Sequence, residues 1–139
     1  MAVSTVHFEI ATRGDAQVVD VTERVRAAIA ESGLRAGIGC LFVPGATGAV
    51  TTMEYEPGCV ADLQRLFEEL APASGTYEHE KRWHDGNGHS HLRAALVGPG
   101  LSFPFDDGEP LLGTWQQIVV IDFDNRARKR KVVLQLVGE

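Results

Sequence analysis

The segment GTWQQIVVIDFDNRARKRKVVLQLV (residues 113–137) decides the fold, because it holds two long β-type runs separated by a turn signal. The first run extends from Gly113 to Phe123 and the second from Arg128 to Val137. Asp124-Asn125 lies between them, and both residue types favour turns. Two such runs joined by a short turn predict an antiparallel hairpin at this end of the chain.

Further strands are predicted upstream of this segment. Strict alternation of apolar and polar residues indicates a half-buried strand over Thr5–Thr12, and Gln17–Val19 is a candidate to pair back with it. The small and apolar run Ala36–Val43 is expected to be a strand buried on both faces. Ala46–Tyr55 and Leu101–Phe105 are expected to form two more strands.

Two longer helices complete the expected fold. Asp20 followed by Glu23 has the spacing of a capping box and predicts a helix over Val21–Ser32. A second apolar stripe predicts a helix over Val60–Leu70. Ala73–Ser90 has no clear periodicity and is expected to be irregular. The order of elements therefore indicates one α+β domain over residues 1–139, mostly antiparallel, with the two main helices on one side of the sheet.

Composition excludes several classes of protein. The 139 residues suffice for one domain, and 44% hydrophobic and 23% charged residues are ordinary for a globular protein. A net charge of −6 argues against nonspecific nucleic-acid binding. No apolar run is long enough to span a membrane, and no secretory signal is recognisable. Cys40 and Cys59 form no zinc or disulfide pattern, so we expect a cytoplasmic protein.

The segment WHDGNGHSH (residues 83–91), together with His79, contains four of the five histidines. In an extended segment His89 and His91 would point the same way and face one divalent ion such as zinc or magnesium. His79 or His84 would supply a third ligand and leave a position open for water. Asp85 would be a ligand or would orient one of the histidines.

Two other interpretations of these histidines remain open. An exposed polar loop without a common target is the simpler one. The same groups would also serve as a phosphate site, or as general acid and base without an ion. The spacing matches no zinc-finger or HExxH pattern.

Three further features are candidates for the same site. The small-residue loop Gly45–Gly48 would offer N–H groups to an anion, although a plain turn is the simpler interpretation. Glu54 would act as a base or ligand if it faced the histidines. The basic run Arg126–Lys131 places Arg126, Arg128 and Arg130 on one face of a strand, where they would hold a phosphorylated substrate or form a solvated or edge-strand surface.

These residues resemble the YjbQ-like family, which carries the name secondary thiamine-phosphate synthase enzyme. The likeness covers nearly the whole chain. Its fingerprint is Tyr77-Glu78-His79, Asp85-Gly86-Asn87, His89-Ser90-His91-Leu92, Gly98-Pro99, Leu112-Gly113-Thr114-Trp115-Gln116 and Arg128.

The resemblance implies a sheet-rich α+β sandwich with helices packed outside, and a homotrimer with sites near the subunit boundaries. It also implies weak condensation of a hydroxymethylpyrimidine diphosphate with a thiazole phosphate. The family's polar signature falls on Thr47, Glu54, His79, Asp85, Asn87 and His91. Many relatives have a histidine where this chain has Gly45, which changes the composition of the expected site.

Three functions are compatible with this sequence. The first is the condensation, with Glu54, Asp85 and Asn87 as catalytic groups, Thr47 and Arg128 as substrate contacts, and an ion held by His79, His84, His89 and His91. The second is metal-dependent hydrolysis of a phosphate or amide. The third is a non-catalytic trimer that binds a small phosphorylated metabolite or a metal.

Overall fold

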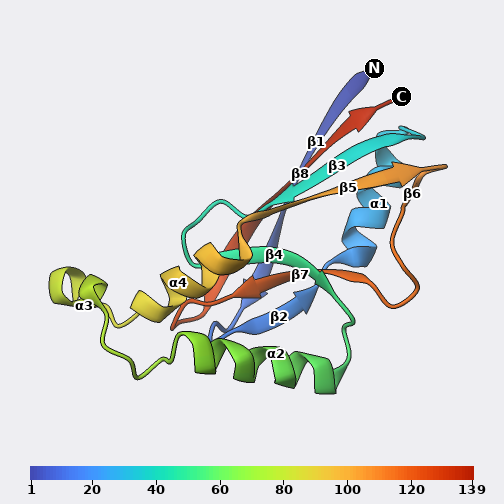
Figure 1. Ribbon diagram of the computed structural model, residues 1–139. Coiled ribbons are helices and arrows are strands. Elements are labelled where there is room, and N and C mark those ends of the chain that lie inside the picture. The colour runs from blue at the N-terminus through green and yellow to red at the C-terminus, as the bar shows by residue number, and fades with distance from the viewer.

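Two antiparallel sheets form the frame of the protein in the computed structural model, which describes all residues 1–139 (Figure 1). The five-stranded sheet has the order β1 (Ala2–Thr12), β8 (Arg128–Gly138), β3 (Gly37–Phe42), β5 (Gly100–Asp106) and β6 (Glu109–Pro110). The three-stranded sheet has the order β2 (Gln17–Asp20), β7 (Gln117–Asp122) and β4 (Gly48–Met53). The expected α+β class and mostly antiparallel sandwich are confirmed.

The predicted C-terminal hairpin is wrong, because its two strands belong to different sheets. β7 pairs with β2 and β4, and β8 pairs with β1 and β3, so neither strand has a free edge for the other. The turn after Phe123 carries the chain from one sheet to the other. The expected pairing of residues 17–19 with the first strand fails for the same reason, since β2 pairs with β7.

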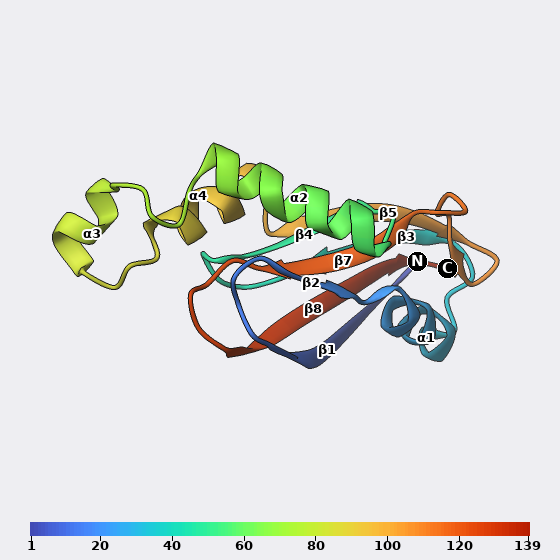
Figure 2. The ribbon, with the colours of Figure 1, turned by 90° about the horizontal axis from the view of Figure 1, so that it is seen from below.

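The helices are α1 (Thr22–Ser32), α2 (Pro57–Leu70), α3 (Glu78–Trp83) and α4 (Gly88–Val97). Alternate residues of β7 face two separate cores. Ile118 and Val120 pack in the core that includes α1, whereas Val119 and Ile121 pack in the core that includes Phe67 of α2. The two main helices therefore lie on opposite sides of the three-stranded sheet, not on one side as predicted (Figure 2).

β3 is buried on one face only, which corrects the prediction of a strand buried on both. Leu41 is fully buried, whereas Ile38, Cys40 and Phe42 are exposed. Their side chains lie on the outer face of the five-stranded sheet, which no helix of the chain covers. No helix of the protein is long and apolar enough to span a bilayer.

The segment predicted to be irregular contains α3 and the start of α4. The short α3 has no buried residue and therefore no apolar stripe that periodicity could detect. α2 also begins earlier than predicted, at Pro57, because the Glu56 carboxylate accepts hydrogen bonds from the Gly58 and Cys59 N–H groups at 2.6 and 2.8 Å.

Helix α4 places His89 in the protein interior, where its side chain is only 5% exposed. Burial lowers the pKa of His89, and the nearby Arg93 guanidinium lowers it further, whereas the Glu68, Glu80 and Asp15 carboxylates oppose the shift. The folded protein therefore favours neutral His89.

A buried ion pair joins the two sheets. Arg130 of β8 donates from Nε and Nη2 to the Asp122 carboxylate of β7 at 3.0 and 2.8 Å, and the Thr12 hydroxyl also donates to Asp122. Burial by itself raises the pKa of Asp122, but the hydrogen bonds from Arg130 and Thr12 outweigh it and lower the pKa below its ordinary value of 3.8.

We expect the substitution Asp122→Asn to lower the free energy of unfolding by about 3–5 kcal/mol, because it leaves the buried Arg130 without its counter-charge. Urea denaturation measures the change. The difference from wild type should shrink below about pH 4, because the wild-type carboxyl there takes up a proton in the unfolded chain and, at still lower pH, in the folded chain as well. Asp107→Asn is the control, since its pair with Arg35 is exposed, and it should cost less than about 1 kcal/mol. Equal losses in both variants would contradict the assignment.

We expect the stability of the wild type to fall as the pH drops below about 6.5, because the unfolded chain protonates His89 more readily than the folded chain does. His89→Gln should reduce the slope of unfolding free energy between about pH 8 and pH 5.5. The matched control is His7→Gln, on the exposed side of β1. An unchanged slope in His89→Gln would refute the contribution of this residue.

Candidate functional site

The candidate site lies at the end of the sandwich where α3, α4, the 45–48 loop and the β7–β8 connection meet. Its centre is a pair of imidazoles from two helices, His79 of α3 and His91 of α4. Their ring centroids are 4.5 Å apart and the ring planes are inclined by 38°. Both side chains are partly exposed, so the pair is open to a solute.

Two carboxylates lie beside His79. The Nδ1 atom is 3.3 Å from Asp85 Oδ1 and 3.6 Å from Glu80 Oε1. One ligand-type atom from each of these three residues lies within 4.8 Å of the others. His79 Nδ1 is buried and has no hydrogen-bond partner. This combination of an unsatisfied nitrogen and two carboxylates is suited to a cation or to proton transfer.

The local backbone explains how Asp85 reaches His79. His84 ends α3 in the left-handed conformation, with φ of 57°, and Gly86 follows with φ of 70°. These two residues reverse the chain, and the Asn125 side chain donates to the Asp85 carbonyl oxygen at 2.9 Å. The Glu80 carboxylate also accepts the Gly88 N–H at the start of α4, which joins the two helices.

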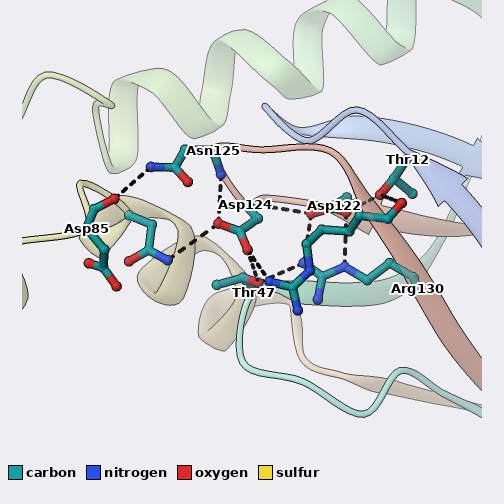
Figure 3. Close-up of polar contacts among 9 residues, drawn as sticks. Thr12, Thr47, Asp85, Asp122, Asp124, Asn125 and Arg130 are labelled. Atoms are coloured by element: carbon teal, nitrogen blue, oxygen red, sulfur yellow. Dashed lines mark hydrogen bonds and ion pairs between the residues drawn. The ribbon is translucent and has the colours of Figure 1, made fainter. Parts of the chain in front are cut away.

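Asp124 is the centre of a polar network next to this cluster (Figure 3). Its carboxylate accepts from Arg128 Nη1 at 2.8 Å, from the Asn125 N–H at 2.8 Å and from the Thr47 hydroxyl at 3.4 Å. Burial raises the pKa of Asp124, but the hydrogen bonds from Asn125 and Asn87 and the charges of Arg128 and Arg130 together lower it. Asp124 is therefore an anion that holds its neighbours in position.

Asn87 connects this network to the histidine cluster. With one orientation of its amide, Nδ2 donates to Asp124 Oδ1 at 3.4 Å. With the amide reversed, Nδ2 donates to Asp85 Oδ1 at 2.9 Å. The side chain thus lies between the two carboxylates, as a positioning group would.

Thr47 connects the network to the buried ion pair. Its hydroxyl oxygen accepts from Arg130 Nη2 at 2.7 Å, and Thr47 itself is buried. The predicted substrate-contact residues Thr47 and Arg128 therefore meet at Asp124 (Figure 3).

Three predicted site residues lie elsewhere. His84 is exposed at the end of α3, and His89 is buried beside Tyr77, with ring centroids 6.3 Å apart. Residues two apart on a helix point about 200° apart, so His89 and His91 cannot face one ion as an extended segment would allow. Glu54 follows the far end of β4, roughly 20 Å along the strand from Gly48, and is exposed.

The sequence analysis missed Glu80, Asp122 and Asp124 as site residues. Asp122 and Asp124 flank Phe123 directly after an apolar strand, which was a usable signal for inward-facing carboxylates. For Arg130 of the predicted arginine face, the solvated and edge-strand interpretations are wrong, whereas Arg126 precedes β8 and is exposed. Arg130 is 3% exposed, and β8 lies between β1 and β3 in the sheet.

Comparison with known proteins places the chain in a family. A model of the family described as UPF0047 protein YjbQ-like matches residues 6–139. A UPF0047 protein of Methanocaldococcus jannaschii is 32% identical over 133 residues, which cover 95% of this chain and 93% of the relative. The UPF0047 protein YugU of Bacillus subtilis is 30% identical over 133 residues, covering 94% of this chain and 97% of the relative.

Solved structures agree with this assignment. A hypothetical protein from Aeropyrum pernix K1 superimposes with a TM-score of 0.91 at 33% identity, covering 98% of this chain and 99% of the other. A YbjQ-like protein of unknown function from Sulfolobus solfataricus P2 gives a TM-score of 0.89 at 28% identity, covering 99% of this chain and all of the other. From its sequence and its fold, the chain belongs to the UPF0047 YjbQ-like family.

Proposed function

We propose that the protein binds a small phosphorylated metabolite at the cluster of His79, His91 and Asp85 and acts on it as a transferase. The supporting observation is the open pair of imidazoles beside two carboxylates, which Asn87 and Asp124 connect to Arg128. The reaction that we propose is the one implied by the resemblance: a thiazole phosphate displaces pyrophosphate from the activated CH2 of a hydroxymethylpyrimidine diphosphate.

A divalent ion, zinc or magnesium, fits the residues of this cluster. The buried, unsatisfied Nδ1 of His79 and the Asp85 carboxylate are ligand types that zinc accepts, and Glu80 and His91 are adjacent. An ion held there would neutralise charge that develops on the leaving pyrophosphate. His84 and His89 are not part of this proposed ligand set.

The chain's own residues have separate roles in the proposal. Arg128 contributes positive charge toward the phosphate groups, while Asp124 and Thr47 fix its position. Asp85 accepts a proton or orients His79, and Asn87 holds the Asp85 carboxylate. Glu54 would join the site only from a neighbouring copy of the chain.

We also propose a homotrimer, as the resemblance implies. The uncovered outer face of the five-stranded sheet supports an assembly, because it exposes several large apolar side chains: Val3, Ile38, Phe42 and Val137. Contiguous exposed apolar surface of this kind is commonly buried between subunits.

The ligand set can be tested by metal content. Untagged protein is incubated with zinc, manganese or magnesium, desalted, and analysed by mass spectrometry for bound metal. We expect about one ion per chain in the wild type and loss of most of it in His79→Ala and in His91→Ala. His84→Ala is the matched control from the same segment and should retain the ion. Absence of metal from the wild type after all three incubations would refute the ligand assignment.

The reaction can be tested by a condensation assay with the pyrimidine diphosphate and the thiazole phosphate, measuring thiamine phosphate by chromatography. Asp85→Asn should lower the rate at least about ten-fold, because it removes the carboxylate next to His79. Asp106→Asn, at an exposed position of β5, should leave the rate unchanged.

Two other outcomes of the same assay would contradict the proposed transferase reaction and indicate a different function. Release of phosphate with water as the only acceptor would identify a hydrolase. Tight binding of the substrates without turnover, unaffected by Asp85→Asn, would identify a binding protein.

A further inference from the structure

A hollow lies beside the imidazole pair, and the proposed reaction assigns no substrate group to this hollow. It has a volume of about 240 Å³ and is lined by Gly45 and Ala46 of the loop before β4, by Gly48 at the start of β4, by His91, Ala94 and Ala95 of α4, and by Pro99. One wall is therefore backbone with almost no side chain, and the other carries one ring of the histidine pair.

The guanidinium of Arg130 lies directly behind the loop wall. A Cβ atom added to Gly45 would have one neighbour within 4 Å, Arg130 Nη1 at 3.2 Å. A Cβ atom added to Gly48 would lie 3.5 Å from the Arg130 Cζ atom. The loop thus passes over the guanidinium, and the missing side chain of Gly45 leaves Nη1 uncovered on that side.

One hydrogen-bond donor of Arg130, the Nη1 atom, has no partner within the chain. Its Nε and Nη2 atoms donate to Asp122, and Nη2 also donates to Thr47, whereas Nη1 has no partner within the chain. Arg130 as a residue is only 3% exposed, but Nη1 is not among the fully buried atoms that lack a partner, so it keeps some accessible surface that a solute in the hollow can reach. An oxyanion in the hollow would accept a charge-assisted hydrogen bond from this N–H group.

We propose that this hollow is an oxyanion subsite that takes a phosphate group of the substrate, with Arg130 Nη1 and the 45–48 backbone as donors. The inference rests on the proposed function only in assigning the phosphate to a substrate. Gly45 has φ of 146°, in the region that favours glycine, which lets the backbone approach the ligand closely. His91 lies at the boundary between this subsite and the cation side of the cluster.

Inorganic phosphate, titrated into metal-free ¹⁵N-labelled protein and followed by NMR, tests the subsite without substrate or ion. We expect saturable shifts of the Gly45, Ala46 and Gly48 amide signals that an equal ionic strength of chloride does not reproduce. Ala95→Glu places a carboxylate at the edge of the hollow and should weaken phosphate binding about ten-fold or more. Ala61→Glu makes the same change on an exposed part of α2 and should leave binding unchanged.

A second variant addresses the donor itself. Arg130→Lys keeps the positive charge but removes Nη1, and its fold is checked by the dispersion of the same spectrum. If it folds, phosphate binding should weaken about as much as in Ala95→Glu. If it unfolds, Ala95→Glu and its control decide the question alone.

The results separate the subsite from the proposed function. No saturable shifts at the 45–48 amides, or equal binding by Ala95→Glu and Ala61→Glu, would overturn the subsite even if His79 and His91 hold a metal. Phosphate binding at these amides in a protein that neither holds metal nor condenses the two substrates would support the subsite and defeat the proposed reaction.

Discussion

The ion pair between Arg130 and Asp122 is the interaction on which the rest of the structure depends. It joins β8 of one sheet to β7 of the other at the end of the sandwich that carries the site. Two charges removed from water are stable together only when good geometry and further hydrogen bonds compensate for desolvation. The hydroxyls of Thr12 and Thr47 provide those bonds, so three strands and the loop before β4 have fixed relative positions there.

Rigidity decreases from this pair toward the outer part of the site. Thr47 and Asp124 are buried and hydrogen-bonded to each other, and Asp124 also pairs with Arg128, whereas α3 has no buried residue and extends away from the sandwich (Figure 1). The position of His79 relative to His91 depends on a few contacts, chiefly the Glu80 carboxylate with the Gly88 N–H and the Asn125 side chain with the Asp85 carbonyl. Regions with few buried contacts open most readily, so the histidine pair can adjust to a ligand while the arginine side of the site stays fixed.

The sequence predicted most strands and both long helices because their apolar residues repeat with a clear period. It failed where the decisive contacts are long-range. Asp124-Asn125 has the composition of a hairpin turn, but both edges of β7 were already occupied by β2 and β4. The density of histidines pointed to a segment in which the fold brings His79 and His91 together, whereas the helical period of α4 turns His89 into the interior. Alternation along β8 puts Arg130 on the same face as the buried Val132 and Leu134 and opposite Lys129 and Lys131, but no local pattern shows that its partner is Asp122 of the other sheet.

The two sides of the site suit ligands of opposite charge. They are separate because one side is built by α3 and the turn after it, and the other by β8. His79, Glu80 and Asp85 come from α3 and the turn after it, and they present carboxylates and an unsatisfied nitrogen to a cation. Arg128 and Arg130 come from β8, and each already neutralises one aspartate, so the anion that we propose for that side would be bound by directed N–H groups more than by net charge. His91 lies between the two sides. A phosphate ester that bridges them would contact both, whereas a free metal ion or a neutral metabolite would use only half of the groups that the fold brings together.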